Sequence, residues 1–179
     1  QLCAYCDQFN LDLIDSICTY VIKSSCKADL FLAKLKEFNV FLMPTGKEGR
    51  WYRFHHLFGN ILKRQLKTSN PEIIIPLCIH ISSWYAEKGL IDKAIQYAIM
   101  VENFDLACNL IAENRFKVFG QGKWWIVKGW LEKIPENIRK SNVDLLLTEL
   151  RICEETWKLE DISAILAILK LMNIENLDA

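Results

Sequence analysis

The sequence has little of what turn-rich or strongly charged proteins require. Its 179 residues include seven glycines and four prolines, too few for the tight turns of an all-β sandwich or barrel. Lys plus Arg number 22, as do Asp plus Glu, and the zero net charge argues against an obligate nucleic-acid binder. No run reaches the roughly 18 apolar residues of a membrane span, so we expect no membrane partner. With 51% apolar residues the chain can bury a core, and we expect a mainly α protein.

Signatures of catalysis and metal binding are also missing. Gly46-Lys47 and Gly122-Lys123 do not complete a phosphate-binding P-loop, because Phe41 and Lys117 stand where its first glycine is required. Three histidines are too few, and wrongly spaced, for a metal site. We therefore predict no enzyme activity, no catalytic residue and no metal ligand.

The seven cysteines are an odd number spread through apolar stretches, which indicates reduced, buried thiols in a cytoplasmic protein. Cys3-x-x-Cys6 has a metal-like spacing, but Cys18 and Cys26 do not supply the second pair that a zinc ribbon needs. The chain starts at Gln1 within an apolar pattern, which suggests a fragment of a longer protein.

The first third of the chain alternates helical and extended patterns. Apolar residues recur at helical spacing in three segments: 11–22, 30–38 and 57–66. Val40–Met43, ended by Pro44, and Trp51–Phe54 are rich in β-forming residues and predict a hairpin across a polar turn. Helices followed by a hairpin are the layout of a small winged-helix domain, which we place at residues 1–68.

After a break at Ser69-Asn70-Pro71, where Asn70 can cap a helix and Pro71 suits its first turn, only helical periodicity remains. The predicted helices cover 74–85, stopped by Gly89, then 92–99, 104–111, 124–131, 143–157 and 162–172. The turns 88–92 and 157–161 look alike and lie 69 residues apart, close to two 34-residue tetratricopeptide (TPR) periods. We therefore expect an antiparallel helical-hairpin, TPR-like array at residues 69–179.

The densest aromatic and basic cluster is Arg50-Trp51-Tyr52-Arg53-Phe54-His55-His56-Leu57-Phe58. It resembles the R-[YF]-H-H-L-F signature of MalT-like, LuxR-type ATP-dependent transcriptional regulators, in the STAND class of signalling ATPases. Leu11–Phe38 and Phe41–Pro44 are similar to the helical start and first strand of that family's winged helix. Trp84–Ile95 and Trp130–Pro135 are similar to its first helical-arm segment, although a proline often seen before the next helix is missing at Asn142-Val143.

The resemblance implies a role for the histidine pair. In the STAND class a winged-helix histidine, within an M-H-D-like motif, contacts the β-phosphate of ADP held by the neighbouring domain. Phe54-His55-His56-Leu57 is similar to M-H-D-L, so His55 takes the phosphate contact, with support from Arg53 and His56. An imidazole N–H is a short, directional donor for such an oxygen. The residues alone favour another interpretation, a pair that caps the helix beginning at Leu57.

The function that the resemblance implies is a non-catalytic module coupling nucleotide state and inducer sensing to transcription activation. Its partners would be the nucleotide-binding and sensor domains of the same chain, with self-association left open. ATP and ADP would be cofactors of the whole ATPase and not of this segment. DNA would be bound only through a C-terminal helix-turn-helix absent from this sequence. The alternative is a TPR-like protein–protein interaction adaptor with no nucleotide role.

Three further groups have interpretations of their own. A basic patch comprises Lys47, Arg50, Arg53, Lys63, Arg64 and Lys67, and the zero net charge favours a solvated surface over DNA binding by the winged helix. Trp124, Trp125 and Trp130 stand at helical spacing, which favours core packing over a ligand-stacking surface. His80 lies in an apolar helix, where we expect a structural role.

Overall fold

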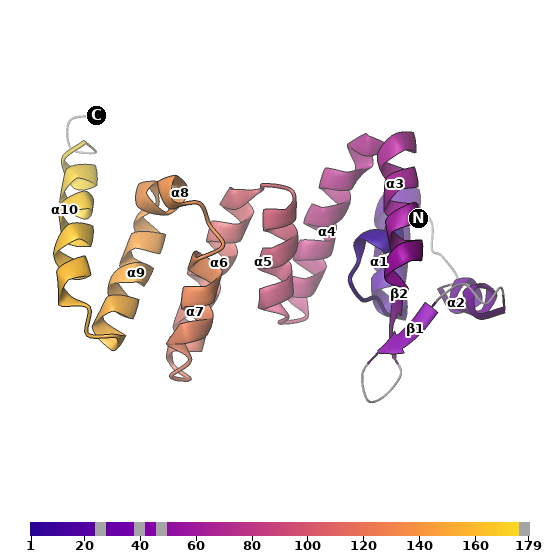
Figure 1. Cartoon of the computed structure of the whole chain (residues 1–179), viewed down its shortest axis with the longest axis horizontal. Coiled ribbons are helices and arrows are strands. Elements are labelled where there is room, and N and C mark those ends of the chain that lie inside the picture. Colours follow the sequence, from indigo (N-terminus) through magenta and orange to yellow (C-terminus); the bar gives the residue numbers. More distant parts are fainter. Residues whose placement is uncertain (24–27, 38–41, 46–49, 176–179) are drawn as a thin grey trace. The chain divides into compact units, whose positions relative to one another are not determined.

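A computed structural model describes residues 1–23, 28–37, 42–45 and 50–175 (Figure 1). Contacts between Cα atoms divide the chain into two compact units, Gln1–Gly89 and Leu90–Ala179. The described part is mainly α, with one two-stranded sheet, and this confirms the predicted fold class. In that part, no helix is both long enough and apolar enough to cross a bilayer.

The first unit has the helices and hairpin of a winged-helix domain. Its elements are η1 (Leu2–Tyr5), α1 (Leu11–Ile22), α2 (Ala28–Glu37), β1 (Leu42–Thr45), β2 (Trp51–Phe54), α3 (His56–Ser69), η2 (Pro71–Ile73) and α4 (Ile74–Glu87). The Asn10 side chain caps α1 by accepting a hydrogen bond from the Leu13 amide at 2.9 Å. Pro71 begins η2 as predicted, but the Asn70 side chain makes no capping bond.

The hairpin differs from the prediction at its first strand. Pro44 and Thr45 lie within β1, and Pro44 is the register partner of Tyr52. The amide and the carbonyl of Tyr52 both form hydrogen bonds with Phe9, at 2.8 Å each, and therefore point away from Pro44. Because Tyr52 needs no hydrogen bond from Pro44, the missing N–H of proline is tolerated in β1. Residues 40 and 41 of the predicted strand lie outside the described residues.

The core of the first unit lies where α1 packs on α4. Leu13, Ile17, Leu77 and Ile81 are fully buried there. The Tyr85 hydroxyl of α4 donates to the Gln8 carbonyl at 2.9 Å. Helix α4 therefore belongs to the first compact unit, whereas the domain boundary at residue 68 stays a prediction.

The second unit is a helical array. Its elements are α5 (Ile91–Met100), α6 (Phe104–Phe119), α7 (Trp124–Leu131), α8 (Glu136–Ser141), α9 (Val143–Glu155) and α10 (Leu159–Glu175). Contacts join α5 to α6, α6 to α7 and α9, and α9 to α10. Asn103 and Asn142 cap α6 and α9 through their side chains, each accepting an amide hydrogen bond at 3.1 Å. Asn142 thus supplies the side-chain cap with which α9 begins.

A similar turn recurs in this part of the chain. In the described residues from Gly89 onward, four residues with positive φ precede a helix by two positions: Gly89 (72°) before Ile91, Glu102 (55°) before Phe104, Gly122 (70°) before Trp124 and Trp157 (57°) before Leu159. Three of them, Gly89, Gly122 and Trp157, lie 33 and 35 positions apart, so Gly89 matches Trp157 at 68 residues and not at the predicted 69. The spacing agrees with the 34-residue TPR period, and the TPR-like assignment stays a prediction.

Candidate functional site

The candidate histidines lie where β2 passes into α3. His55 is the residue preceding α3, and its carbonyl accepts a hydrogen bond from the Gly59 amide at 2.9 Å. Its side chain makes no capping hydrogen bond, so the expected capping role for the pair is not seen at this residue. The His55 and His56 rings lie 4.3 Å apart between centroids.

Aromatic packing fixes this junction. The Phe54 ring lies 5.0 Å from the Phe9 ring and 5.6 Å from the Phe58 ring between centroids. A Cβ at Gly59 would lie 3.6 Å from the Phe54 Cβ, an ordinary contact. The end of β2 is therefore held against both the segment before α1 and the first turns of α3.

A pocket of about 350 Å³ opens beside the junction. Arg53 and His56 line it, together with Lys63 and Asp7, whereas His55 is not among its lining residues. His56, Asn60 and Lys63 lie at helical spacing on one face of α3, which is why one pocket receives all three. Lys63 is predicted only as part of a basic patch, although its helical spacing from His56 is a signal that links the two residues.

The donors around this pocket, which we call the junction pocket, suit an oxyanion. Arginine and lysine form charge-assisted hydrogen bonds with phosphate oxygens, and the amino-terminal end of a helix adds a partial positive charge. Asp7 is the one acidic side chain in the lining. Arg53, His56 and Lys63 can therefore hold one phosphate group, and the described lining shows no second set of cationic donors.

The thiols near this site are structural. Cys6 lines the junction pocket but is buried. Its burial is the main reason that the pKa of its thiol lies well above the usual range, and the neighbouring Cys3 and Cys78 raise the pKa further. Burial raises the pKa of Cys78 to about 11. Protonated thiols are poor nucleophiles and metal ligands. The six described cysteines are buried and form no disulfide with one another, which confirms their predicted burial, and Cys26 lies outside the described residues.

The remaining candidates have structural roles. His80 stacks on Tyr20 at 4.2 Å between centroids and shares a 2.8 Å hydrogen bond with Ser16, as expected for a structural histidine. Trp130 is buried, which confirms core packing for this residue, whereas Trp125 is largely exposed. In the basic patch Arg50, Arg64 and Lys67 are exposed, and Lys47 lies outside the described residues.

Comparison with known proteins agrees with this architecture. Residues 2–74 match the model of the MalT winged helix domain. The HTH-type transcriptional regulator MalT of Vibrio cholerae serotype O1 is 22% identical to the chain over 177 residues, which are 97% of this chain and 19% of that protein. Residues 2–74 are therefore a winged helix domain of the MalT type.

Other relatives cover different shares of the chain. MalT of Vibrio campbellii is 21% identical over 161 residues, 90% of the chain and 17% of that protein. The serine/threonine-protein kinase PknK of Mycobacterium tuberculosis is 26% identical over 108 residues, 60% of the chain and 10% of the kinase. The chain spans about a fifth or less of the length of these relatives.

Proposed function

We propose that this chain is a non-catalytic switch module of a longer, signal-responsive, ATP-dependent transcriptional regulator of the LuxR type and the STAND class. The match of residues 2–74 to the MalT winged helix domain supports this proposal, as does the MalT similarity that extends into the helical array. The module would act in the cytoplasm, between the nucleotide-binding and sensor domains of its own chain. DNA would be bound by a separate helix-turn-helix.

The observation that carries the proposal is the cluster at the β2–α3 junction. Arg53, His56 and Lys63 line the junction pocket, and the ring of His55, directly before α3, lies 4.3 Å from the ring of His56 between centroids. This donor set fits a phosphate group such as the one that ADP would supply. His55 lies beside the pocket without lining it, and in the proposed mechanism it donates an imidazole N–H to that phosphate, with support from Arg53 and His56.

Such a contact would bias a conformational equilibrium. A hydrogen bond to a charged group contributes about 1.5–3 kcal/mol, comparable with the coupling energies of about 1–3 kcal/mol that operate many allosteric proteins. Because the contact would form only in the closed, ADP-bound state, removing its donor would shift the population towards the active state.

The test is basal transcription by the whole regulator without inducer. The proposal predicts that His55→Ala raises basal transcription at unchanged protein level. His80→Gln is the matched control, since His80 packs on α1 away from the junction pocket, and it should leave basal transcription unchanged. Wild-type basal transcription in a folded His55→Ala protein would argue against the switch.

A second candidate is a TPR-like adaptor with no nucleotide role. Three of the four turns that place a positive φ two positions before a helix, those at Gly89, Gly122 and Trp157, recur after 33 and 35 residues, which favours this possibility. It predicts that substitutions at Arg53, His55 and His56 leave both nucleotide affinity and basal transcription unchanged, which separates it from the switch.

A further inference from the structure

A second pocket lies within the helical array, between α6 and α9. It encloses about 450 Å³, within the range of small-molecule sites. Four apolar side chains contribute to its wall: Phe116, Phe119, Leu147 and Leu150. Arg115 and Arg151 also line this pocket, which we call the α6–α9 groove, and it shares no residue with the junction pocket.

Arg115 is an unusual residue in this wall because it is a buried charge with one donor unused. Its side chain is 9% exposed, and its Nη2 donates to Asp144 Oδ1 at 2.6 Å. Its buried Nη1 has no hydrogen-bond partner within the described part of the chain. A buried donor without an acceptor is unfavourable, so an acceptor supplied by a ligand would stabilise the site.

Phe116 packs against the guanidinium group of Arg115. Its ring centroid lies 4.7 Å from the Arg115 guanidinium carbon, yet the side chain is 70% exposed. Few neighbours hold so exposed a ring, and a rotation about its side-chain bonds would open a path to Nη1. Leu147, on the other helix, is 46% exposed and leaves the groove with an apolar surface open to solvent.

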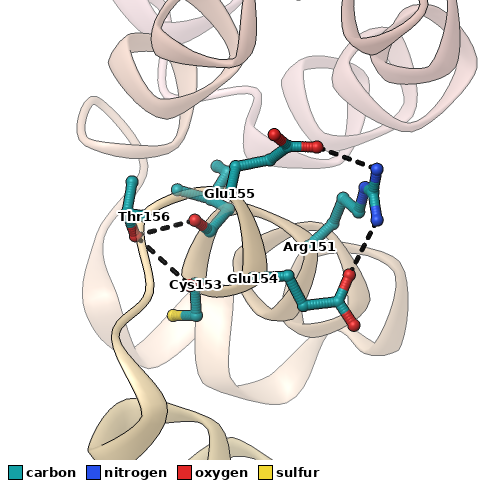
Figure 2. A network of polar contacts seen from close by, with 6 residues as sticks. Arg151, Cys153, Glu154, Glu155 and Thr156 are labelled. Atoms are coloured by element: carbon teal, nitrogen blue, oxygen red, sulfur yellow. Dashed lines mark hydrogen bonds and ion pairs between the residues drawn. The ribbon is translucent and has the colours of Figure 1, made fainter.

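The charges of the groove select the chemistry of its ligand. Asp144 already neutralises Arg115, and Arg151 donates to both Glu154 and Glu155 at 2.8 Å (Figure 2). A carboxylate ligand would therefore add an uncompensated negative charge beside Asp144. An uncharged carbonyl oxygen would satisfy Nη1 without that penalty.

We propose that the α6–α9 groove binds a small, uncharged, apolar molecule that carries a carbonyl acceptor. Nη1 of Arg115 donates to the carbonyl oxygen, and the apolar body packs on Phe119, Leu147 and Leu150. The site gives the helical array a ligand input of its own, independent of any nucleotide at the junction pocket.

Acetophenone and benzoate are suitable probes because they share a phenyl ring and differ in the charge of the acceptor. Titrated into the 179-residue chain and followed by amide NMR shifts, acetophenone should perturb residues 115–120 and 147–151. It should bind at least about threefold more tightly than benzoate. Both probes can accept a hydrogen bond from Nη1, but only benzoate adds a negative charge beside Asp144. Equal or tighter binding of benzoate, or shifts confined to other segments, would overturn the proposal.

Two variants test the residues. Leu147→Asp should weaken acetophenone binding about tenfold by placing a charge in the apolar wall. Leu166→Asp alters a similarly exposed leucine on α10 that is not among the groove's lining residues, and it should have no effect. Arg115→Lys keeps the charge that faces Asp144 but loses the second donor arm, and should weaken binding about fivefold. If Arg115→Lys does not fold, unchanged binding by Leu147→Asp would still refute the site.

Discussion

The indole N–H of Trp130 donates a hydrogen bond to Asp92 Oδ1 at 2.5 Å and joins α7 to the first turn of α5. These residues come from the two sequence segments that resemble the MalT-like helical arm, Trp84–Ile95 and Trp130–Pro135. Trp130 is 2% exposed, so this bond satisfies a buried donor. Asp92 also lies where a negative charge favours the amino-terminal end of a helix.

Removing the acceptor should destabilise the array. Asp92→Ala leaves the buried indole N–H unpaired and should lower the free energy of unfolding by about 1–3 kcal/mol. Urea denaturation of the 179-residue chain measures the change. Asp105→Ala is the control, because Asp105 is an exposed acid in the first turn of α6. Equal losses in both variants would show that the bond to Trp130 contributes nothing beyond the helix-end charge.

Substitutions in two of the repeated turns should change the stability of the protein in opposite directions. Gly89 has φ of 72° and open space where a Cβ would lie, so Gly89→Ala should cost about 1 kcal/mol through backbone strain alone. Trp157 has φ of 57° and is 84% exposed, and Trp157→Gly should therefore raise stability by up to about 1 kcal/mol.

Gly129→Ala is the control for these substitutions. Gly129 lies in α7 without a positive φ, and nothing is near its missing Cβ, so alanine should stabilise the helix by about 0.5–1 kcal/mol. Urea denaturation reports all three variants. A stabilising Gly89→Ala or a destabilising Trp157→Gly would contradict the assignment of these turns.

The His80 site predicts a pH dependence. Burial lowers the pKa of His80 below its ordinary value of 6.5, against smaller opposing effects of Ser16 and Glu87. The unfolded chain therefore takes up a proton first as the pH falls below about 6.5, and stability declines until the folded protein also protonates. His80→Gln should flatten the stability profile between about pH 7 and pH 5. A slope unchanged from wild type would refute this.

Two helices differ from the prediction because their apolar and polar residues do not follow the usual helical pattern. The predicted helix 104–111 ends eight residues early, because in α6 the charged Arg115 is buried and the apolar Phe116 is exposed, which reverses the expected pattern. Helix α8 has no buried residue and therefore no apolar periodicity to detect. By contrast, the regular apolar spacing of 11–22 predicts α1 with both ends correct.

The candidate site, like the fold, could be predicted from the sequence only in part. The motif placed His55 and His56 at the junction between the hairpin and α3, where the structure has them. Asp7 could not be foreseen in the junction pocket, because the bridge between Phe9 and Tyr52 brings this distant segment to the hairpin. Such non-local pairing leaves no periodic signal in the sequence.

The phosphate contact of His55 is tested most directly by the ADP dissociation constant of the whole regulator, measured by titration calorimetry. If His55 makes this contact, His55→Ala should weaken ADP binding about tenfold or more, through the loss of one charge-assisted hydrogen bond. Arg64→Ala, which removes an exposed charge of α3 outside the junction pocket, should leave the constant unchanged. An unchanged ADP dissociation constant in a folded His55→Ala protein would show that His55 does not contact the phosphate.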